Sequence, residues 1–132
     1  MITKSVATSK HSQFINITRL VEEAIHESEI KSGVATIFVS HTTAGITINE
    51  NADPDVTRDM LNILERMVPW EHPDYRHFEG NTAAHMKASM MGNSTQIILE
   101  DGRLQLGTWQ GIYFCEFDGP RQRKVGIKIQ KS

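Results

Sequence analysis

Strand-type segments at both ends of the chain, with helical patterns between them, limit the possible folds more than any other feature. Near the C-terminus, residues 95–100 and 104–117 flank Asp101-Gly102, a dipeptide that favours the tight turn of a β-hairpin. Residues 124–130 predict another strand because apolar and polar residues alternate there. Its inward-facing positions are Val125, Ile127 and Ile129. The C-terminal third is therefore expected to be β-structure.

The N-terminal part predicts three further strands. Residues 2–9 and 13–17 carry alternating or β-branched residues around a polar corner, which is typical of a short antiparallel pair. Residues 34–41 are also β-rich, and their alternation places His41 on the same face as Ile37 and Val39. This strand is therefore expected to end in a histidine.

Two helices are predicted between these ends. The spacing of apolar residues indicates a helix with Thr18 as its N-cap that ends near Gly33. A second helix over about residues 54–68 begins at Asp53-Pro54, an acidic cap followed by proline at the first helical position. With the strands, these helices place the chain in the α+β class.

A loop and a short helix follow the second helix. Residues 70–80 show no clear period and are expected to form an irregular segment, a type that often carries function. Asn81 is a candidate cap for a short helix through Met91, which Gly92 would end. The loop and the start of this helix bring several polar residues together in the sequence.

Composition limits the possible locations and partners. The 132 residues fit a single domain, and no stretch approaches the roughly 18 to 20 apolar residues of a membrane span. The lone Cys115 can form no intrachain disulfide and the first residues lack a secretory signal, so we expect a cytoplasmic protein. Fourteen basic residues against sixteen acidic ones give no excess for a nucleic-acid backbone. We therefore expect any anionic partner to be small and locally bound, and not a nucleic acid or a membrane.

The stretch from Ser40 to Asn51 is the first that suggests chemistry. It runs from the predicted strand into small hydroxyl residues and a glycine, and it contains His41 and Glu50 within ten residues. A histidine beside oxygen donors offers a proton carrier or a metal ligand. The alternative is a hairpin whose hydroxyls bond to nearby backbone, with His41 at a surface tip.

The second stretch, residues 77–85, carries a histidine at each end. His77 lies in the predicted loop and His85 one turn into the next helix, so the two rings can converge on a point. Zinc sites tolerate such spacing, although the pattern alone is weak. The alternatives are a helix-capping histidine or imidazoles that bind a phosphate.

The third stretch places a carboxylate on an apolar strand face. Glu116 shares one face with Ile112 and Phe114, so it needs a cation, a metal or hydrogen-bond donors unless it lies at the sheet edge in water. Arg121 and Arg123 follow the next turn, and arginine pairs suit the planar recognition of phosphate, although solvated charges are the commoner outcome.

The opposite face of the same strand carries three aromatic residues, so both faces must be covered, which a symmetric oligomer would explain. These residues are Trp109, Tyr113 and Phe117.

These motifs resemble the secondary thiamine-phosphate synthase, or YjbQ-like, family over nearly the whole chain. The resemblance is carried by residues 40–54, by His77 to His85, and by Leu106 to Gln110 with Glu116 to Arg123. It implies one domain over residues 1–132 with an antiparallel β-sandwich core and two to three helices. It also implies a homotrimer with pockets near the subunit boundaries. The implied reaction condenses a pyrimidine pyrophosphate with a thiazole phosphate to give thiamine phosphate and pyrophosphate.

The resemblance also supplies candidate roles for individual residues. The implied catalytic residues are His41, Glu50, Glu116 and Arg121. The implied substrate-binding residues are Asn81, Gln110, Arg121 and Arg123. The implied ligands of a divalent ion, whether zinc, magnesium or manganese, are His41, His77 and His85. Two alternative functions remain open: a metal-dependent hydrolase, and a non-catalytic binder of a small phosphorylated metabolite.

Overall fold

The computed structural model describes all 132 residues as eight strands and three helices. The elements in chain order are β1 (Ile2–Ala7), β2 (Gln13–Asn16), α1 (Thr18–Ser28), β3 (Gly33–Phe38), β4 (Ala44–Glu50), α2 (Pro54–Met67), α3 (Thr82–Met91), β5 (Ser94–Glu100), β6 (Arg103–Leu104), β7 (Gln110–Glu116) and β8 (Gln122–Lys131). No helix combines the length and the hydrophobicity needed to cross a bilayer.

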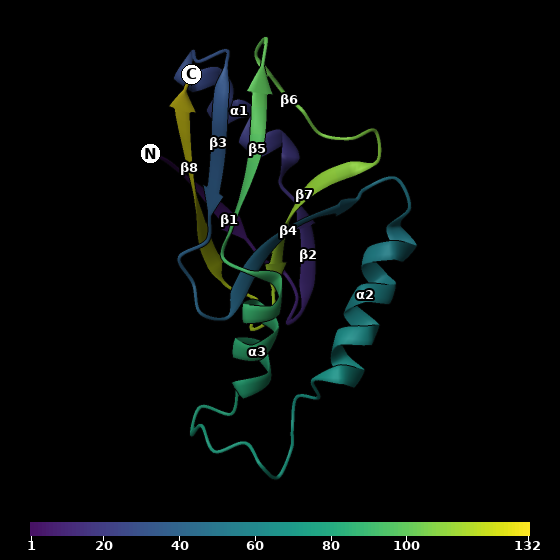
Figure 1. The fold of residues 1–132 in the computed structure, drawn as a ribbon. Coiled ribbons are helices and arrows are strands. Elements are labelled where there is room, and N and C mark those ends of the chain that lie inside the picture. The colour runs from purple at the N-terminus through teal and green to yellow at the C-terminus, as the bar shows by residue number, and fades with distance from the viewer.

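The strands form two antiparallel sheets (Figure 1). One sheet, called sheet A below, has the order β1-β8-β3-β5-β6, and the other, sheet B, has the order β2-β7-β4. Every pairing within them is antiparallel. The predicted α+β fold with an antiparallel sandwich core is therefore confirmed, and of the predicted two to three helices the structure has three.

The main core lies between the two sheets. Ile37 and Ile127 of sheet A pack with Ile112 and Phe114 of sheet B, and all four side chains are fully buried. Helix α1 adds Val21 and its apolar neighbours to the same cluster. The alternation predicted for residues 34–41 and 124–130 is thus explained, since one face of each strand contributes to this core. The predicted end of the first strand was wrong, because β3 ends at Phe38 and His41 lies in the loop before β4.

A second core lies on the other face of β7, against the helices. Tyr113, Cys115 and Phe117 pack with Ala88 of α3 and Leu64 of α2. From the sequence, a partner subunit is expected to cover this face of β7. The structure shows that α2 and α3 of the same chain cover it. Trp109, predicted to share the face, precedes β7 and is 62% exposed.

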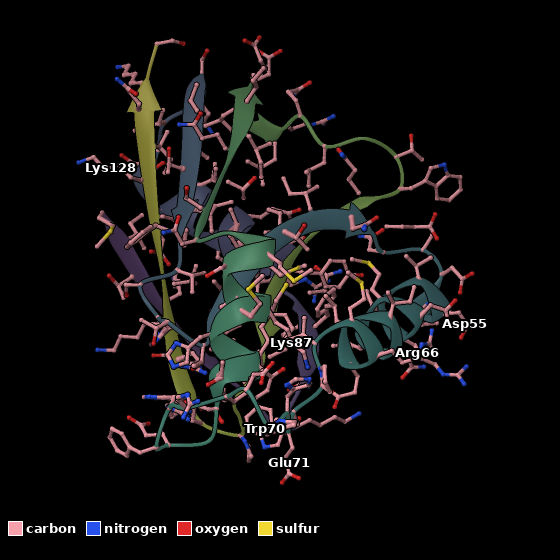
Figure 2. The ribbon with its side chains drawn as sticks, turned by 60° about the horizontal axis from the view of Figure 1, so that its bottom comes forward. Asp55, Arg66, Trp70, Glu71, Lys87 and Lys128 are labelled. Atoms are coloured by element: carbon pink, nitrogen blue, oxygen red, sulfur yellow. The ribbon has the colours of Figure 1, made fainter.

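Helix α2 is attached to the rest of the molecule through few residues. Asp53 caps it by accepting the Asp55 N–H at 2.9 Å, as the sequence predicts. At the other end, Lys87 of α3 is only 2% exposed and donates to Glu65 of α2 at 2.9 Å. Figure 2 shows Lys87 between the two helices. This ion pair is therefore one of the fixed points of α2.

Two strand predictions were wrong. Residues 2–9 and 13–17 do not pair with each other, because β1 pairs with β8 in sheet A whereas β2 pairs with β7 in sheet B. Residues 104–117 are not one strand, because the segment 105–109 carries the chain from sheet A to sheet B. In both places the chain changes sheet, which a local pattern of alternation does not reveal.

Candidate functional site

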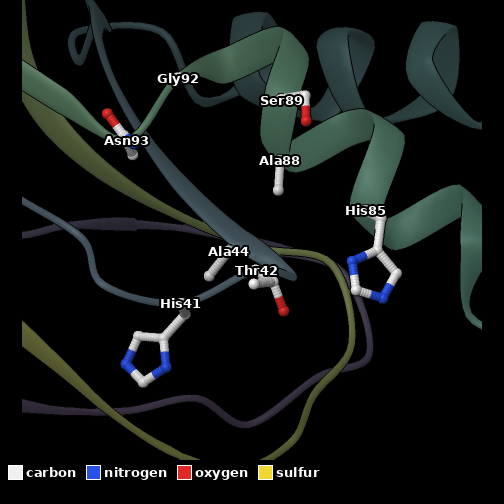
Figure 3. Close-up of a pocket in the computed structure, with 8 residues that line it drawn as sticks. All are labelled: His41, Thr42, Ala44, His85, Ala88, Ser89, Gly92 and Asn93. Atoms are coloured by element: carbon white, nitrogen blue, oxygen red, sulfur yellow. The ribbon is translucent and has the colours of Figure 1, made fainter.

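A cavity of about 560 Å³ lies between α3 and the loop that joins β3 to β4. Figure 3 shows the imidazoles of His41 and His85 at opposite sides of this cavity, with Thr42 and Ala44 between them. Ala88, Ser89, Gly92 and Asn93 complete the lining. The volume falls within the range of small-molecule sites. Two of the three predicted catalytic or ligating histidines therefore face one cavity.

The position of α3 depends on a close approach to β4. A Cβ at Gly45 would lie 2.8 Å from the carbonyl oxygen of Gly92, so only glycine lets the helix end so near the strand. The Ile46 N–H donates to the same Gly92 carbonyl at 3.0 Å. These contacts hold the C-terminal end of α3 against β4, and His85 lies on the part of the helix that borders the cavity.

His41 is held in one tautomer. The backbone N–H of Lys124 donates to its Nε2 at 3.0 Å, so Nε2 carries a lone pair and the neutral ring keeps its proton on Nδ1. Partial burial and the nearby positive charge of Arg123 lower the pKa of His41 from its ordinary value of 6.5. At neutral pH the ring is therefore an uncharged hydrogen-bond donor.

The three histidines predicted to bind a metal do not form a metal site within one chain. His77 contacts His85, with ring centroids 5.4 Å apart, but no three His, Cys, Asp or Glu side chains come close enough to hold an ion. The Nε2 lone pair of His41 is already used. One chain therefore does not bring three donors together for a divalent ion, and ligation by His41, His77 and His85 is an untested prediction.

Glu116 and Arg123 form a buried ion pair. Arg123 donates from Nε to Oε1 at 2.8 Å and from a terminal nitrogen to Oε2, and the two residues are 0% and 3% exposed. Thr8 Oγ1 and the Asp118 N–H supply the other two hydrogen bonds, at 2.8 and 3.0 Å. Burial alone would raise the pKa of Glu116, but Arg123 and these donors outweigh it and lower the pKa below its ordinary value. Arg123 is thus the partner that Glu116 needs on this apolar strand face.

This pairing changes the roles expected of both residues. The carboxylate of Glu116 is fully occupied, and Arg123 also donates to Thr43 Oγ1 at 2.9 Å. Glu116 is 0% exposed and Arg123 only 3%, and the hydrogen bonds that both groups make lie within the chain, so we assign neither group a contact with substrate. We therefore treat Glu116 and Arg123 as positioning residues, which hold the loop that carries His41.

Asp118 connects the remaining predicted residues. Its Oδ2 accepts from Asn81 Nδ2 at 2.9 Å and from a terminal nitrogen of Arg121 at 3.1 Å. The Arg121 side chain is 49% exposed, so it lies at the surface while Asp118 fixes its direction. Asn81 precedes α3 as predicted, but its side chain does not cap the helix, and its buried Oδ1 has no partner.

Two predicted site residues lie at the other end of the molecule. In the β4–β7 pair, Ala44 faces Glu116 at one end and Glu50 faces Gln110 at the other. Six residue steps separate the ends, or about 20 Å at roughly 3.3 Å per step. Glu50 and Gln110 therefore do not join His41 and His85 within one chain.

Several residues of this region were missed in the sequence. Thr8 and Thr43 hold the buried ion pair, Asp118 links Asn81 to Arg121, and Ser89 and Asn93 line the cavity. Asp118 lies within the stretch from Glu116 to Arg123, where the sequence indicates only a turn. Thr8 gave no signal, because a threonine at a strand end is common and its partner is 108 residues away.

Comparison with known proteins gives one consistent result. The family model described as "UPF0047 protein YjbQ-like" matches residues 3–132. The chain is 60% identical to UPF0047 protein YugU of Bacillus subtilis over 127 residues, which are 96% of each chain. It is 51% identical to UPF0047 protein MJ1081 of Methanocaldococcus jannaschii, over 94% of this chain and 89% of the relative.

Solved structures agree with these sequence matches. A crystal structure of a YjbQ/UPF0047 family protein from Clostridium acetobutylicum has a TM-score of 0.96 and 61% identity, and the match covers 98% of this chain and all of that one. A structure of protein TT1486 from Thermus thermophilus has a TM-score of 0.92 at 41% identity, covering 98% of this chain and all of that one.

Proposed function

The chain belongs to the YjbQ-like UPF0047 family, and on this premise we propose that it is a thiamine-phosphate synthase-like transferase. In the proposed reaction, a pyrimidine carrying a methyl pyrophosphate reacts with a thiazole phosphate to give thiamine phosphate and pyrophosphate. The proposed active site is the cavity between His41 and His85. The resemblance to the synthase family motivates the reaction, and the residues around the cavity provide the physical argument.

The observation that carries the proposal is the pair of imidazoles, His41 and His85, that face one cavity. Arg123 and Arg121 both lie near enough for their charges to act on His41. Because Glu116 neutralises Arg123, the half-exposed guanidinium of Arg121 is the positive charge that a phosphoryl group near these imidazoles would meet. Because His41 is neutral at pH 7, it would bind through its Nδ1–H as a donor rather than as a cation.

The bonding changes of this reaction fit the residues that line the cavity. The carbon–oxygen bond of the pyrimidine methyl pyrophosphate breaks, and its electron pair leaves on pyrophosphate. The thiazole nitrogen then attacks the methyl carbon with its own lone pair, so no proton has to be removed. The lining contains no carboxylate, and this reaction needs none. A hydrolase would need a base to activate water, and the imidazole of His85 can supply one, so the lining does not separate the hydrolase from the transferase and the resemblance to the synthase family decides the choice.

Arg121 is the residue best placed to stabilise the leaving group. Its guanidinium is half exposed and is fixed by Asp118, whereas Arg123 is enclosed by its own partners. Stabilising charge that develops on departure lowers the barrier more than it strengthens substrate binding. We therefore assign to Arg121 the contact that stabilises the leaving pyrophosphate. His41 is the fixed hydrogen-bond donor to the substrate, and His85 lies on the opposite side of the cavity.

The test is turnover with both thiamine precursors, followed by chromatographic measurement of thiamine phosphate. Arg121→Ala and His85→Ala should lower kcat by about 30- to 1000-fold, the equivalent of about 2 to 4 kcal/mol per lost contact. The matched controls Arg58→Ala and His72→Ala change exposed residues that do not line the cavity, and they should keep normal turnover. No turnover in the unmutated protein, together with tight binding of a precursor, would instead identify a non-catalytic binder.

A further inference from the structure

We propose that the chain has a second ligand site, which binds a small organic anion with an apolar ring or chain. The site is a cavity of about 580 Å³ between α1 and the β5–β6 turn. It lies at the end of the molecule where Gln110 begins β7, away from His41 and His85. The proposal goes beyond the proposed synthase activity and does not depend on it.

Part of the lining of this cavity is apolar. Ile25 of α1, Ile30, Leu104 of β6 and Leu106 line it, and all four belong to the main core or pack against it. Because these side chains are fixed by the core, the cavity wall is preformed rather than a gap between mobile groups. A ligand with an apolar body would bury that body here.

Two unpaired cations border the same cavity. Lys31 and Arg103 line it, and neither forms an ion pair within the chain. The β5–β6 turn is tied to Lys31, since the Gly102 N–H donates to the Lys31 carbonyl at 2.8 Å. One carboxylate, Glu22, also lines the cavity, so the formal charges sum in favour of an anion. The ligand therefore carries a carboxylate or a phosphate.

Gln110 supplies an oriented hydrogen-bond donor. Its Oε1 accepts the Gly107 N–H at 2.8 Å, which fixes the amide and leaves both hydrogens of Nε2 free. Beside it, Gly111 leaves room for Asn51, because a Cβ there would lie 2.8 Å from Asn51 Nδ2. Both amides line the cavity. Residues of the sequence motifs around 49–51 and 107–110 thus line this second cavity, whereas they do not line the cavity of His41 and His85.

The experiment is a titration of the ¹⁵N-labelled full chain, followed by NMR, with benzoate, phenyl phosphate, benzyl alcohol and inorganic phosphate. Benzoate or phenyl phosphate should shift the Gly102 amide and the Gln110 side-chain amide. Arg103→Ala and Lys31→Ala should each weaken that binding about tenfold or more, the size expected for a charge-assisted hydrogen bond. Arg66→Ala, an exposed arginine on α2, is the matched control and should have no effect.

The other two compounds separate the parts of the proposal. Benzyl alcohol lacks the anion and inorganic phosphate lacks the apolar body, so each should bind about tenfold more weakly or worse. Equal binding of benzyl alcohol would overturn the anion site, and equal binding of inorganic phosphate would overturn the apolar subsite. Shifts confined to residues around His41 would overturn the second site altogether. Arg103→Ala should keep thiamine-phosphate turnover, so failure here is distinguishable from failure of the proposed function.

Discussion

Arg123 and Glu116 join the two sheets of the sandwich through one buried ion pair. Glu116 ends β7 in sheet B, and Arg123 lies in β8 of sheet A, seven residues later. The intervening turn brings the guanidinium onto the carboxylate, with Nε 2.8 Å from Oε1. The same guanidinium reaches Thr43, two residues from His41. The pair therefore holds the two sheets together at this end of the sandwich and also holds the loop that borders the histidine cavity.

Removing one charge of this pair should destabilise the fold. Glu116→Gln leaves Arg123 buried with a neutral partner, and breaking a buried pair in this way costs about 3 to 5 kcal/mol. We expect urea denaturation to show a loss of about that size. Glu71→Gln, an exposed carboxylate in the loop after α2, is the control and should change stability by less than about 0.5 kcal/mol. Equal midpoints for the two variants would show that the pair adds nothing to stability.

The same pair should make the protein sensitive to acid. The pKa of Glu116 is lower in the folded chain than its ordinary value of 4.5. Below pH 4.5 the unfolded chain therefore takes up this proton before the folded chain does. Its contribution to stability is complete above pH 4.5 and is lost as the pH falls through the folded pKa. Stability curves between pH 5 and 2 should be shallower for Glu116→Gln than for the unmutated chain, and parallel curves would contradict this.

His41 should titrate below 6.5 in the folded chain. Its pKa is lowered by burial, then by Arg123 and, to a smaller extent, by Arg121. The unfolded chain binds this proton near pH 6.5 and the folded chain only at lower pH, so stability falls as the pH drops through that window. NMR titration of the His41 ring should show the low midpoint, and Arg121→Ala should raise it toward 6.5. Arg58→Ala should leave it unchanged, and a midpoint at or above 6.5 would refute the expectation.

The sequence predicted the elements of the fold well but not how they assemble. Asp53-Pro54 marked the start of α2, and Asp101-Gly102 marked a hairpin whose two residues both have positive φ, at 51° and 75°. Such local chemistry acts within a few residues. Which sheet a strand joins depends on pairing with distant residues, so the separation of β1 from β2 was not predictable from alternation.

The candidate site was predictable only in part, for a related reason. The need of Glu116 for a partner follows from one strand face, but the identity of that partner depends on the turn that returns Arg123 to it. The convergence of His41 and His85 depends on α3 packing against β4 at Gly45. Glu50 and Gln110 looked like members of the same site because the sequence does not show which ends of β4 and β7 meet.

The buried Lys87 should hold α2 against the body. Lys87→Met keeps the length and the apolar stem but removes the ion pair with Glu65. We expect faster hydrogen exchange at the α2 amides, since the helix buries only Leu64 fully and depends on a few contacts. Lys128→Met, an exposed lysine of β8, is the control. Unchanged exchange in α2 with Lys87→Met would show that packing alone fixes the helix.

The homotrimer implied by the family resemblance remains a prediction, and the outer face of sheet A supplies its test. Ile98 of β5 is 57% exposed, pairs with Val34 of β3, and lies on the same sheet as the exposed Phe38. Three chains of 14.9 kDa should give about 45 kDa by light scattering. Ile98→Lys places a charge on this apolar stripe and should lower the mass toward that of one chain. Ile63→Lys, an equally drastic change at an exposed position of α2, should leave it unchanged. A single-chain mass for the unmutated protein at micromolar concentration would reject the trimer, and dissociation by Ile63→Lys alone would place the interface on α2.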